Sequence, residues 1–342
     1  MKKFLWFVFF ISLIAASWGS YKYYQWFKKS AVKAEIENRS IYVRSGTDLE
    51  DLFQLLEESG ALKSVEDFKK LSKLKGLENP QSGHYVLNHG QSNNQLVNMF
   101  QGGLQTPVKL IIIPLRTPEA LAGKIATYIE LDSATILSAL KSEMIANKYG
   151  MNNYSFYTMF LPDTYEVYWN LSLNKLLDRM SSEYNSFWNS ERKAKAKAID
   201  LNPQEVATLA SIVLAEQLKH ADERPRIAGL YLNRLKKGMA LQSDPTLIYA
   251  NGDFSINRVL NKDKEIDSPY NTYMYPGLPP GPIYLPDKSS IDAVLNAETN
   301  RYLYMCAKPD NSGYHAFATN LRQHNNNARK YQRWISKQGI YR

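Results

Sequence analysis

The sequence has very little cysteine and histidine. The 342-residue chain holds a single cysteine, Cys306, which excludes an intrachain disulfide and any zinc site built from cysteines. Because Cys306 lies in the apolar run 302–307, we expect its thiol to be a quiet core group. The five histidines are scattered and show no HExxH-type spacing, so the sequence predicts no metal site.

A Lys/Arg-rich block is also absent, although the chain is basic overall, with a formal net charge of +9. A positive balance favours an anionic partner such as nucleic acid, lipid headgroups or an acidic polymer, cell wall included. Nucleic-acid surfaces are typically marked by clusters of basic residues. We therefore expect no nucleic-acid partner.

One long uncharged run stands near the N-terminus. Residues 4–21 carry no charge and follow Lys2 and Lys3. As a helix this run is about 27 Å long, close to the ~30 Å hydrocarbon core of a bilayer, and the aromatic residues and lysines after it suit the membrane–water interface. We predict a cytoplasmic start and transmembrane anchor over 1–27. A cleaved signal peptide is the alternative, and both interpretations export the rest of the chain.

Short alternating elements follow the predicted anchor. Residues 28–40 are polar and are predicted to form a stalk. The pattern then predicts a strand at 41–44, helices at 48–59 and from Ser64, and a strand at 82–87. A further helix (93–100) and a strand (110–114) complete a small α+β module over 41–115. From Thr117 the pattern becomes helical, which predicts a larger mixed α/β domain over 116–342 and an α+β fold class overall.

A helix with strong start signals carries the first candidate catalytic residue. Asn202 and Glu205 can form a capping box around Pro203. The apolar positions Val206, Leu209, Ile212 and Val213 mark the buried face.

Glu216 falls on that same apolar face, which is unusual for a carboxylate. Burial disfavours the charged form and raises the pKa, and a carboxylic acid that stays protonated near neutral pH serves as a general acid. The alternative is a structural ion pair with Arg224 or Arg226.

Polar and turn-forming segments downstream provide candidate ligand contacts. Sugars are bound by hydrogen-bonding side chains and aromatic faces, which Gln242, Ser243, Asn271 and Tyr273 offer. The alternative is that Pro and Gly fix tight turns here and that the tyrosines pack in the core.

These segments, taken in order, resemble the endolytic murein transglycosylase family (YceG-like, MltG). The resemblance rests on residues 209–216, 223–224, 233–235, 241–246, 268–273, 277–283, 302–304 and on His315, Phe317, Thr319, Asn320 and His324, with 162–166 as a further match. One departure concerns the family pattern Glu-x-Glu, because Leu214 occupies the first position and Glu216 the second, catalytic one. The loop 217–222 is one residue longer than the pattern.

The resemblance implies a fold, an activity and a site. It implies a LysM-like subdomain at 41–115 and a catalytic domain at 116–342. The implied reaction is non-hydrolytic cleavage of the β-1,4 bond between N-acetylmuramic acid and N-acetylglucosamine in nascent strands, which leaves 1,6-anhydro ends. Glu216 is the expected catalytic acid/base, and no metal or cofactor is expected. The expected substrate-binding residues are Gln242, Ser243, Asp244, Asn271, Tyr273 and His315.

The implied partners are peptidoglycan, the membrane and the cell-wall synthesis machinery, with the catalytic domain in the periplasmic, extracytoplasmic space. Two alternatives stay open. One is a two-carboxylate glycoside hydrolase in which Asp244, Asp163 or Glu166 assists Glu216. The other is a non-catalytic, membrane-anchored wall-binding protein.

Overall fold

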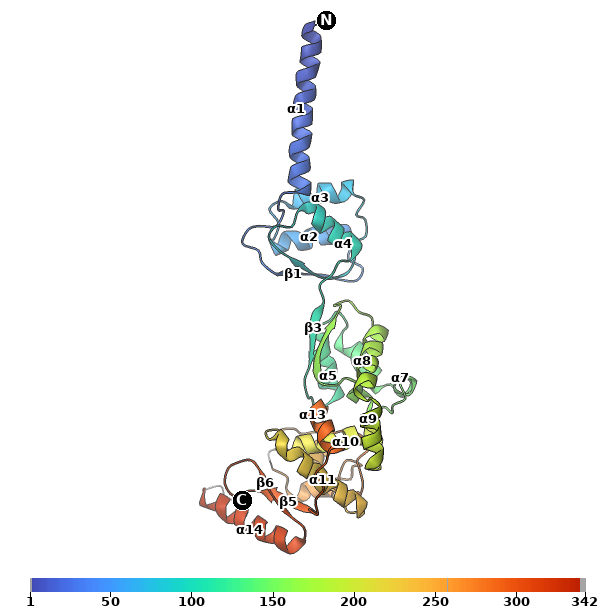
Figure 1. Cartoon of the computed structure of the whole chain (residues 1–342), viewed down its shortest axis with the longest axis vertical. Helices are drawn as coiled ribbons and strands as arrows, with labels where there is room; N and C mark the ends of the chain where they lie inside the picture. The colour runs from blue at the N-terminus through green and yellow to red at the C-terminus, as the bar shows by residue number, and fades with distance from the viewer. Residues whose placement is uncertain (1, 257, 339–342) are drawn as a thin grey trace. The chain divides into compact units, whose positions relative to one another are not determined.

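The structure is a computed structural model that describes residues 2–256 and 258–338. The ends of the predicted segments 1–27 and 116–342, at residues 1 and 339–342, lie outside the described residues. The chain forms two compact units (Figure 1). Unit 1 comprises 1–110, 128–131 and 165–172, and unit 2 comprises 111–127, 132–164 and 173–342.

Unit 1 begins with the long helix α1 (Lys2–Phe27) (Figure 1). None of its residues is fully buried, and it is long and apolar enough to cross a membrane. Its last residues, Trp26 and Phe27, pack against the core of unit 1. The indole of Trp26 donates a hydrogen bond to Asp67 Oδ1 at 3.3 Å.

The rest of unit 1 follows the predicted strand–helix–helix–strand order. Its elements are β1 (Arg39–Val43), α2 (Leu49–Ser59), α3 (Val65–Leu74), β2 (Gly83–Leu87) and α4 (Asn93–Gly102). β1 and β2 are antiparallel, with Ile41 opposite Tyr85. The side chains of Asp48, Ser64 and Ser92 cap the three helices. Apolar residues of these helices and of the two strands form the core of unit 1.

Residues 28–40 are not the free stalk that the sequence predicted. Ala31, Val32 and Ile36 are buried in the unit 1 core, and single-residue bridges pair Ser30 with Ser92 and Val32 with Leu62. The segment is polar in overall composition, but it contains these three apolar side chains. The free energy gained by burying them outweighs the entropy lost in ordering the chain around them.

Unit 2 is largely helical. Its helices are α5 (Pro118–Ala126), α6 (Ser133–Lys141), α7 (Glu143–Lys148), α8 (Leu173–Phe187), α9 (Ser190–Ala198), α10 (Pro203–Glu216), α11 (Arg224–Lys236), α12 (Asp244–Asn251), α13 (Lys288–Leu295) and α14 (Leu321–Lys337), with short 3₁₀ turns at 156–159, 221–223 and 261–265. β3 (Val108–Ile112) pairs with β4 (Asp163–Val167), and the boundary between the units runs through both strands.

A second pair, β5 (Tyr304–Ala307) and β6 (His315–Ala318), forms an antiparallel hairpin. Cys306 lies on β5 and is only partly buried, so the expectation of a core thiol is only partly met. The segment 241–246, one of those expected to form turns, contains the start of α12. Pro245 stands in the first turn of this helix, a position in which a helix tolerates proline.

Candidate active site

The helix α10 positions Glu216 at its C-terminal end. The capping box is formed as predicted: Asn202 Oδ1 accepts from the Glu205 backbone N–H at 3.0 Å, and Glu205 Oε2 accepts from the Asn202 backbone N–H at 2.8 Å. The helix is buried on all sides from Val206 to Leu214, and not along one face only. A helix that is apolar all round lies in the centre of a domain, so α10 is a rigid support for its last residue.

The carboxyl of Glu216 is held through one oxygen. Tyr231 Oη donates to Glu216 Oε1 at 2.8 Å, and Ser243 Oγ donates to the same atom at 2.5 Å. Glu216 is partly buried, and its Oε2 makes no hydrogen bond within the described ranges. Oε2 is therefore the oxygen available to a substrate.

Burial raises the pKa of Glu216 above its ordinary value. The hydrogen bonds from Ser243 and Tyr231 and the nearby His315 oppose this increase, while the charge of Asp244 adds to it. The net direction is upward, as the sequence predicted for a general acid.

The structural ion pair considered as an alternative does not form. Arg224 Nη1 lies 3.3 Å from Asp287 Oδ2, and Arg226 Nε lies 2.9 Å from Glu298 Oε2. Both guanidinium groups thus have other partners, and Glu216 receives neutral hydroxyl donors.

Ser243 and Asp244 lie beside Glu216 at the start of α12. Ser243 is in the N-cap position but makes no capping bond with its side chain, because its hydroxyl is directed to Glu216. Asp244 Oδ1 accepts a hydrogen bond from Tyr273 Oη at 2.5 Å. Three of the predicted substrate-binding residues, Ser243, Asp244 and Tyr273, are thereby brought together around the predicted acid.

Gln242 is fixed in an uncommon backbone conformation, with φ of 53°. Its N–H donates to Thr272 O at 2.9 Å, and its Oε1 accepts from Arg234 Nη1 at 3.1 Å. A positive φ in a non-glycine residue persists only where the surroundings impose it. Arg234 and the 271–272 loop together impose it here.

Asn271 is placed differently from its predicted role. Its Nδ2 donates to the carbonyls of Lys264 and Ile266, and its Oδ1 accepts from the N–H groups of Tyr273 and Met274. The side chain is fully buried and its amide is committed to the backbone of its own loop. This geometry favours positioning of Tyr273, and direct substrate contact stays a prediction.

His315, at the start of β6, is tied to the loop that follows α10. Its Nδ1 lies 2.8 Å from Glu223 Oε2, and its backbone N–H donates to Glu223 Oε1 at 2.9 Å. Gln217 Nε2 donates to Glu223 Oε2 at 2.7 Å. Burial raises the pKa of Glu223, but the hydrogen bonds from His315 and Gln217 more than offset it, and the net direction is downward.

Sequence reasoning missed Tyr231 and Arg234, both on α11. Tyr231 follows Ile227 by one helical turn on a buried face, and a buried tyrosine hydroxyl normally requires a hydrogen-bond partner. That rule predicts that the Tyr231 hydroxyl has a polar partner, but it does not show that the partner is Glu216. In the sequence, Arg234 belongs to the motif 233–235, which does not show that its side chain is buried beside the site.

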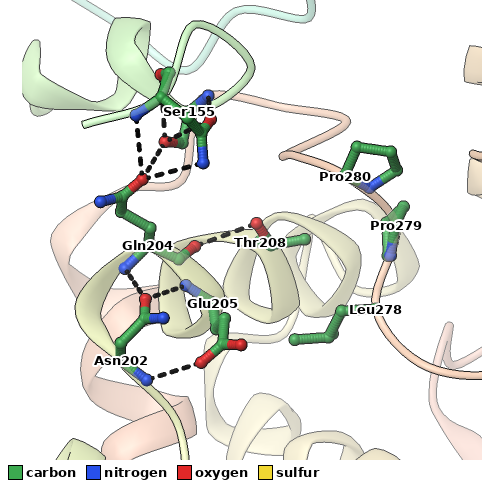
Figure 2. Close-up of a pocket in the computed structure, with 9 residues that line it drawn as sticks. Ser155, Asn202, Gln204, Glu205, Thr208, Leu278, Pro279 and Pro280 are labelled. Carbon is green, nitrogen blue, oxygen red and sulfur yellow. Dashed lines mark hydrogen bonds between the residues drawn. The ribbon is translucent and has the colours of Figure 1, made fainter. Parts of the chain in front are cut away.

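Two cavities lie near the residues described above. One of about 270 Å³ adjoins the site and is lined in part by Gln242 and Tyr273. The other, of about 340 Å³, lies at the start of α10 (Figure 2). There Gln204 Oε1 accepts from Ser155 Oγ and Asn152 Nδ2, so the polar groups of the second cavity mainly satisfy one another.

Within the described part of the chain, no three His, Cys, Asp or Glu side chains are grouped so as to hold a metal ion.

The sequence profile described as the YceG-like family matches residues 41–330. The chain belongs to the YceG-like family.

The relatives that resemble this chain include proteins with a named activity and a protein of known structure. An endolytic murein transglycosylase of Bacillus subtilis (strain 168) is 32% identical over 318 residues, 85% of this chain and 84% of the relative. One from Streptococcus pneumoniae (strain ATCC BAA-255 / R6) is 27% identical over 366 residues, 95% of this chain but 64% of that relative. A crystal structure of a yceG-like protein from Listeria monocytogenes has a TM-score of 0.58 and 27% identity, covering 84% of this chain and 97% of that one.

Proposed function

We propose that the chain is an endolytic peptidoglycan lytic transglycosylase with Glu216 as its single catalytic acid/base. The observation that carries this proposal is the state of the Glu216 carboxyl. Burial raises its pKa, two hydroxyls hold Oε1, and Oε2 is left without an intramolecular partner among the described residues. The named activity of the Bacillus subtilis relative gives the substrate class.

The reaction requires one proton donor that later becomes the acceptor. Glu216 Oε2 gives its proton to the oxygen that bridges the two sugars, and positive charge develops at C1 of the muramic acid. The C6 hydroxyl of the same sugar attacks C1, and Glu216 takes the hydroxyl proton, which closes the 1,6-anhydro ring. The attacking group is already part of the substrate, so no second carboxylate is needed to activate water.

Tyr231 and Ser243 act on this cycle through Oε1. Once Glu216 has given up its proton, their two hydrogen bonds stabilise the carboxylate in a partly dry site, where such bonds are stronger than in water. They also keep the raised pKa from becoming so high that the acid would hold its proton.

The competing reaction is hydrolysis with Asp244 as a second carboxylate. The charge of Asp244 does act on Glu216, which favours it over Asp163, whose partner is Lys288. Digestion of purified glycan strands followed by mass spectrometry separates the two reactions. A transglycosylase leaves anhydro ends, whereas a hydrolase leaves reducing ends that are heavier by one water. Reducing ends would overturn the proposal.

The same proposal places α1 in the membrane as a single-pass anchor, with the catalytic residues on the extracytoplasmic side, where peptidoglycan lies. The element order of unit 1 is compatible with a LysM-like module over 41–115, and the cell-wall synthesis machinery is the expected protein partner. A protease added to intact spheroplasts should digest the part of the chain that follows α1. Protection from protease would reverse the orientation.

A further inference from the structure

Arg234 is a buried cation without an acidic partner. The residue is 5% exposed. Its Nε donates to Leu303 O at 2.6 Å, and its Nη1 donates to the carbonyls of Ala240 and Leu241 and to Gln242 Oε1, at 2.8, 3.1 and 3.1 Å. All of these acceptors are neutral. Within residues 2–256 and 258–338, Arg234 forms no ion pair, and its Nη2 makes no hydrogen bond.

The 270 Å³ cavity lies against this guanidinium group. Its lining includes Arg234, Gln242, Tyr273, Tyr304, Leu321 and His324. His324 Nδ1 is buried and has no hydrogen-bond partner in the described structure. Buried polar atoms are normally paired. The residues that line this cavity therefore include two unused polar atoms, Arg234 Nη2 and His324 Nδ1.

The cavity adjoins the proposed acid. Arg234 follows Tyr231 by three residues on α11, so the two side chains lie on neighbouring positions of one helix, and Tyr231 donates to Glu216. Gln242 immediately precedes Ser243, the second donor to Glu216. A group seated in the cavity would belong to the sugar at the cleaved bond or to the substituent next to it.

We propose that this cavity, the Arg234 cavity, is a subsite for a carboxylate carried by the muramic acid unit of the substrate. A planar guanidinium with a free nitrogen is well suited to a carboxylate. The anion would also neutralise a buried charge that otherwise has no counter-ion. This subsite rests on the proposed function, because it assigns part of the same substrate.

Two sources of carboxylate exist in peptidoglycan. In a strand without peptides, the lactyl ether of muramic acid ends in a free carboxylate. In a strand with peptides, that group is an amide, and the carboxylates belong to the peptide. The test therefore uses both strands, each in its native form and after conversion of its carboxylates to methylamides.

The experiment measures KM and kcat of the full chain in detergent on these four substrates. Hydrogen bonds to a charged group contribute about 1.5–3 kcal/mol, so neutralising the carboxylate should raise KM about tenfold or more. The strand type in which this loss occurs identifies the source. The variant Arg234→Gln should cleave native and methylamidated strands with the same KM. Equal KM values for all four substrates with the unaltered chain would overturn the subsite.

A second variant guards against misfolding of Arg234→Gln, since Arg234 also holds residues 240–242. Leu321→Trp changes a half-exposed residue of the cavity lining and leaves the Arg234 bonds intact. It should narrow the cavity and raise KM for native strands more than for methylamidated ones. An equal change for both would count against the proposal. If the unaltered chain yields no anhydro ends from any strand, the proposed function itself fails, a result distinct from cleavage that ignores the carboxylate.

Discussion

Glu216 is subject to two opposing influences from its own neighbours. Burial favours its protonated form, whereas the hydroxyls of Ser243 and Tyr231 favour the carboxylate. An acid that must both donate and recover a proton within one turnover needs a pKa between these extremes. The two hydroxyls are neutral donors, and the nearby His315 also favours the carboxylate.

Replacing Glu216 with Gln should abolish the formation of anhydro ends while the chain still folds, because an amide has no proton to transfer. Mass spectrometry of digested strands measures the loss, and Glu205→Gln is the matched control on the same helix, since Gln also completes a capping box. Unchanged cleavage by Glu216→Gln would reject the catalytic assignment.

The same variant has a pH signature in stability. The folded pKa of Glu216 is raised, so the folded state of the unaltered chain binds the proton more tightly than the unfolded state. The contribution of Glu216 to stability therefore falls as pH rises from about 4.5 through the raised pKa. Melting curves over this range should show Glu216→Gln gaining relative stability with rising pH, and a constant difference would contradict a raised pKa.

Ser243→Ala should lower kcat by about tenfold or more, because it removes a hydroxyl bond to a charged group. Burial would then raise the pKa of Glu216 with less opposition, so the alkaline limb of the pH–rate profile should move to higher pH. Ser255→Ala, at a hydroxyl bonded to Asp253, is the control. A lower kcat without movement of that limb would indicate that Ser243 only packs.

At the scale of elements, α11 carries Tyr231 to the site by passing very close to another segment. A Cβ at Gly229 would lie 2.2 Å from Glu298 O and 2.6 Å from Asn300 Nδ2. Glycine at this helical position is required by the close approach of backbone, although glycine is normally unfavourable in a helix.

Gly229→Ala should therefore destabilise unit 2 by about 1–3 kcal/mol, as overpacking does, and should reduce activity through displacement of Tyr231. Gly123→Ala is the matched control on α5, because nothing lies within 4 Å of its added Cβ and alanine is the better helix former by about 1 kcal/mol. Thermal melting and strand cleavage measure both. A stabilising effect of Gly229→Ala would contradict the packing described.

The loop between α10 and α11 is fixed by Glu223, which joins Gln217 to His315. Glu223→Gln should lower stability at neutral pH by about 1–3 kcal/mol, because the amide cannot accept all three bonds. The pKa of Glu223 is lowered on balance, so its contribution is present above about pH 4.5 and is lost as pH falls through the lowered value. Melting curves of the unaltered chain and of Glu223→Gln should therefore show a larger difference in stability at pH 7 than at pH 3. An equal difference at both would mean that the carboxylate is not stabilised by folding.

At the scale of the whole molecule, we propose that α1 anchors the chain and so determines where the chemistry takes place. It is exposed along its length and can cross a bilayer, whereas its last turn packs on unit 1. Deletion of residues 2–22 preserves that last turn.

The truncated chain should move from the membrane fraction to the soluble fraction and should still release anhydro ends from isolated strands, since unit 2 retains every site residue. Ultracentrifugation of cell extracts, with the full chain as control, measures the change. Retention of the truncated chain in the membrane fraction would show a second membrane contact.

The sequence by itself determined the local features of this protein. Alternation, helical spacing and capping residues located α2, α4, α10 and β2, and placed Glu216 on an apolar surface, because these signals act between residues that are neighbours along the chain. The segment 28–40 and the start of α12 were misjudged, since their structure depends on burial against distant residues.

Only the tertiary structure decided which side chains meet at the acid. Tyr231, Ser243 and His315 are separated from Glu216 by 15, 27 and 99 positions, and no periodicity links residues so far apart. Their convergence comes from the packing of α11, α12 and the β5–β6 hairpin around the end of α10. That packing supplies the hydroxyl donors to the carboxyl and forms the cavity beside Arg234.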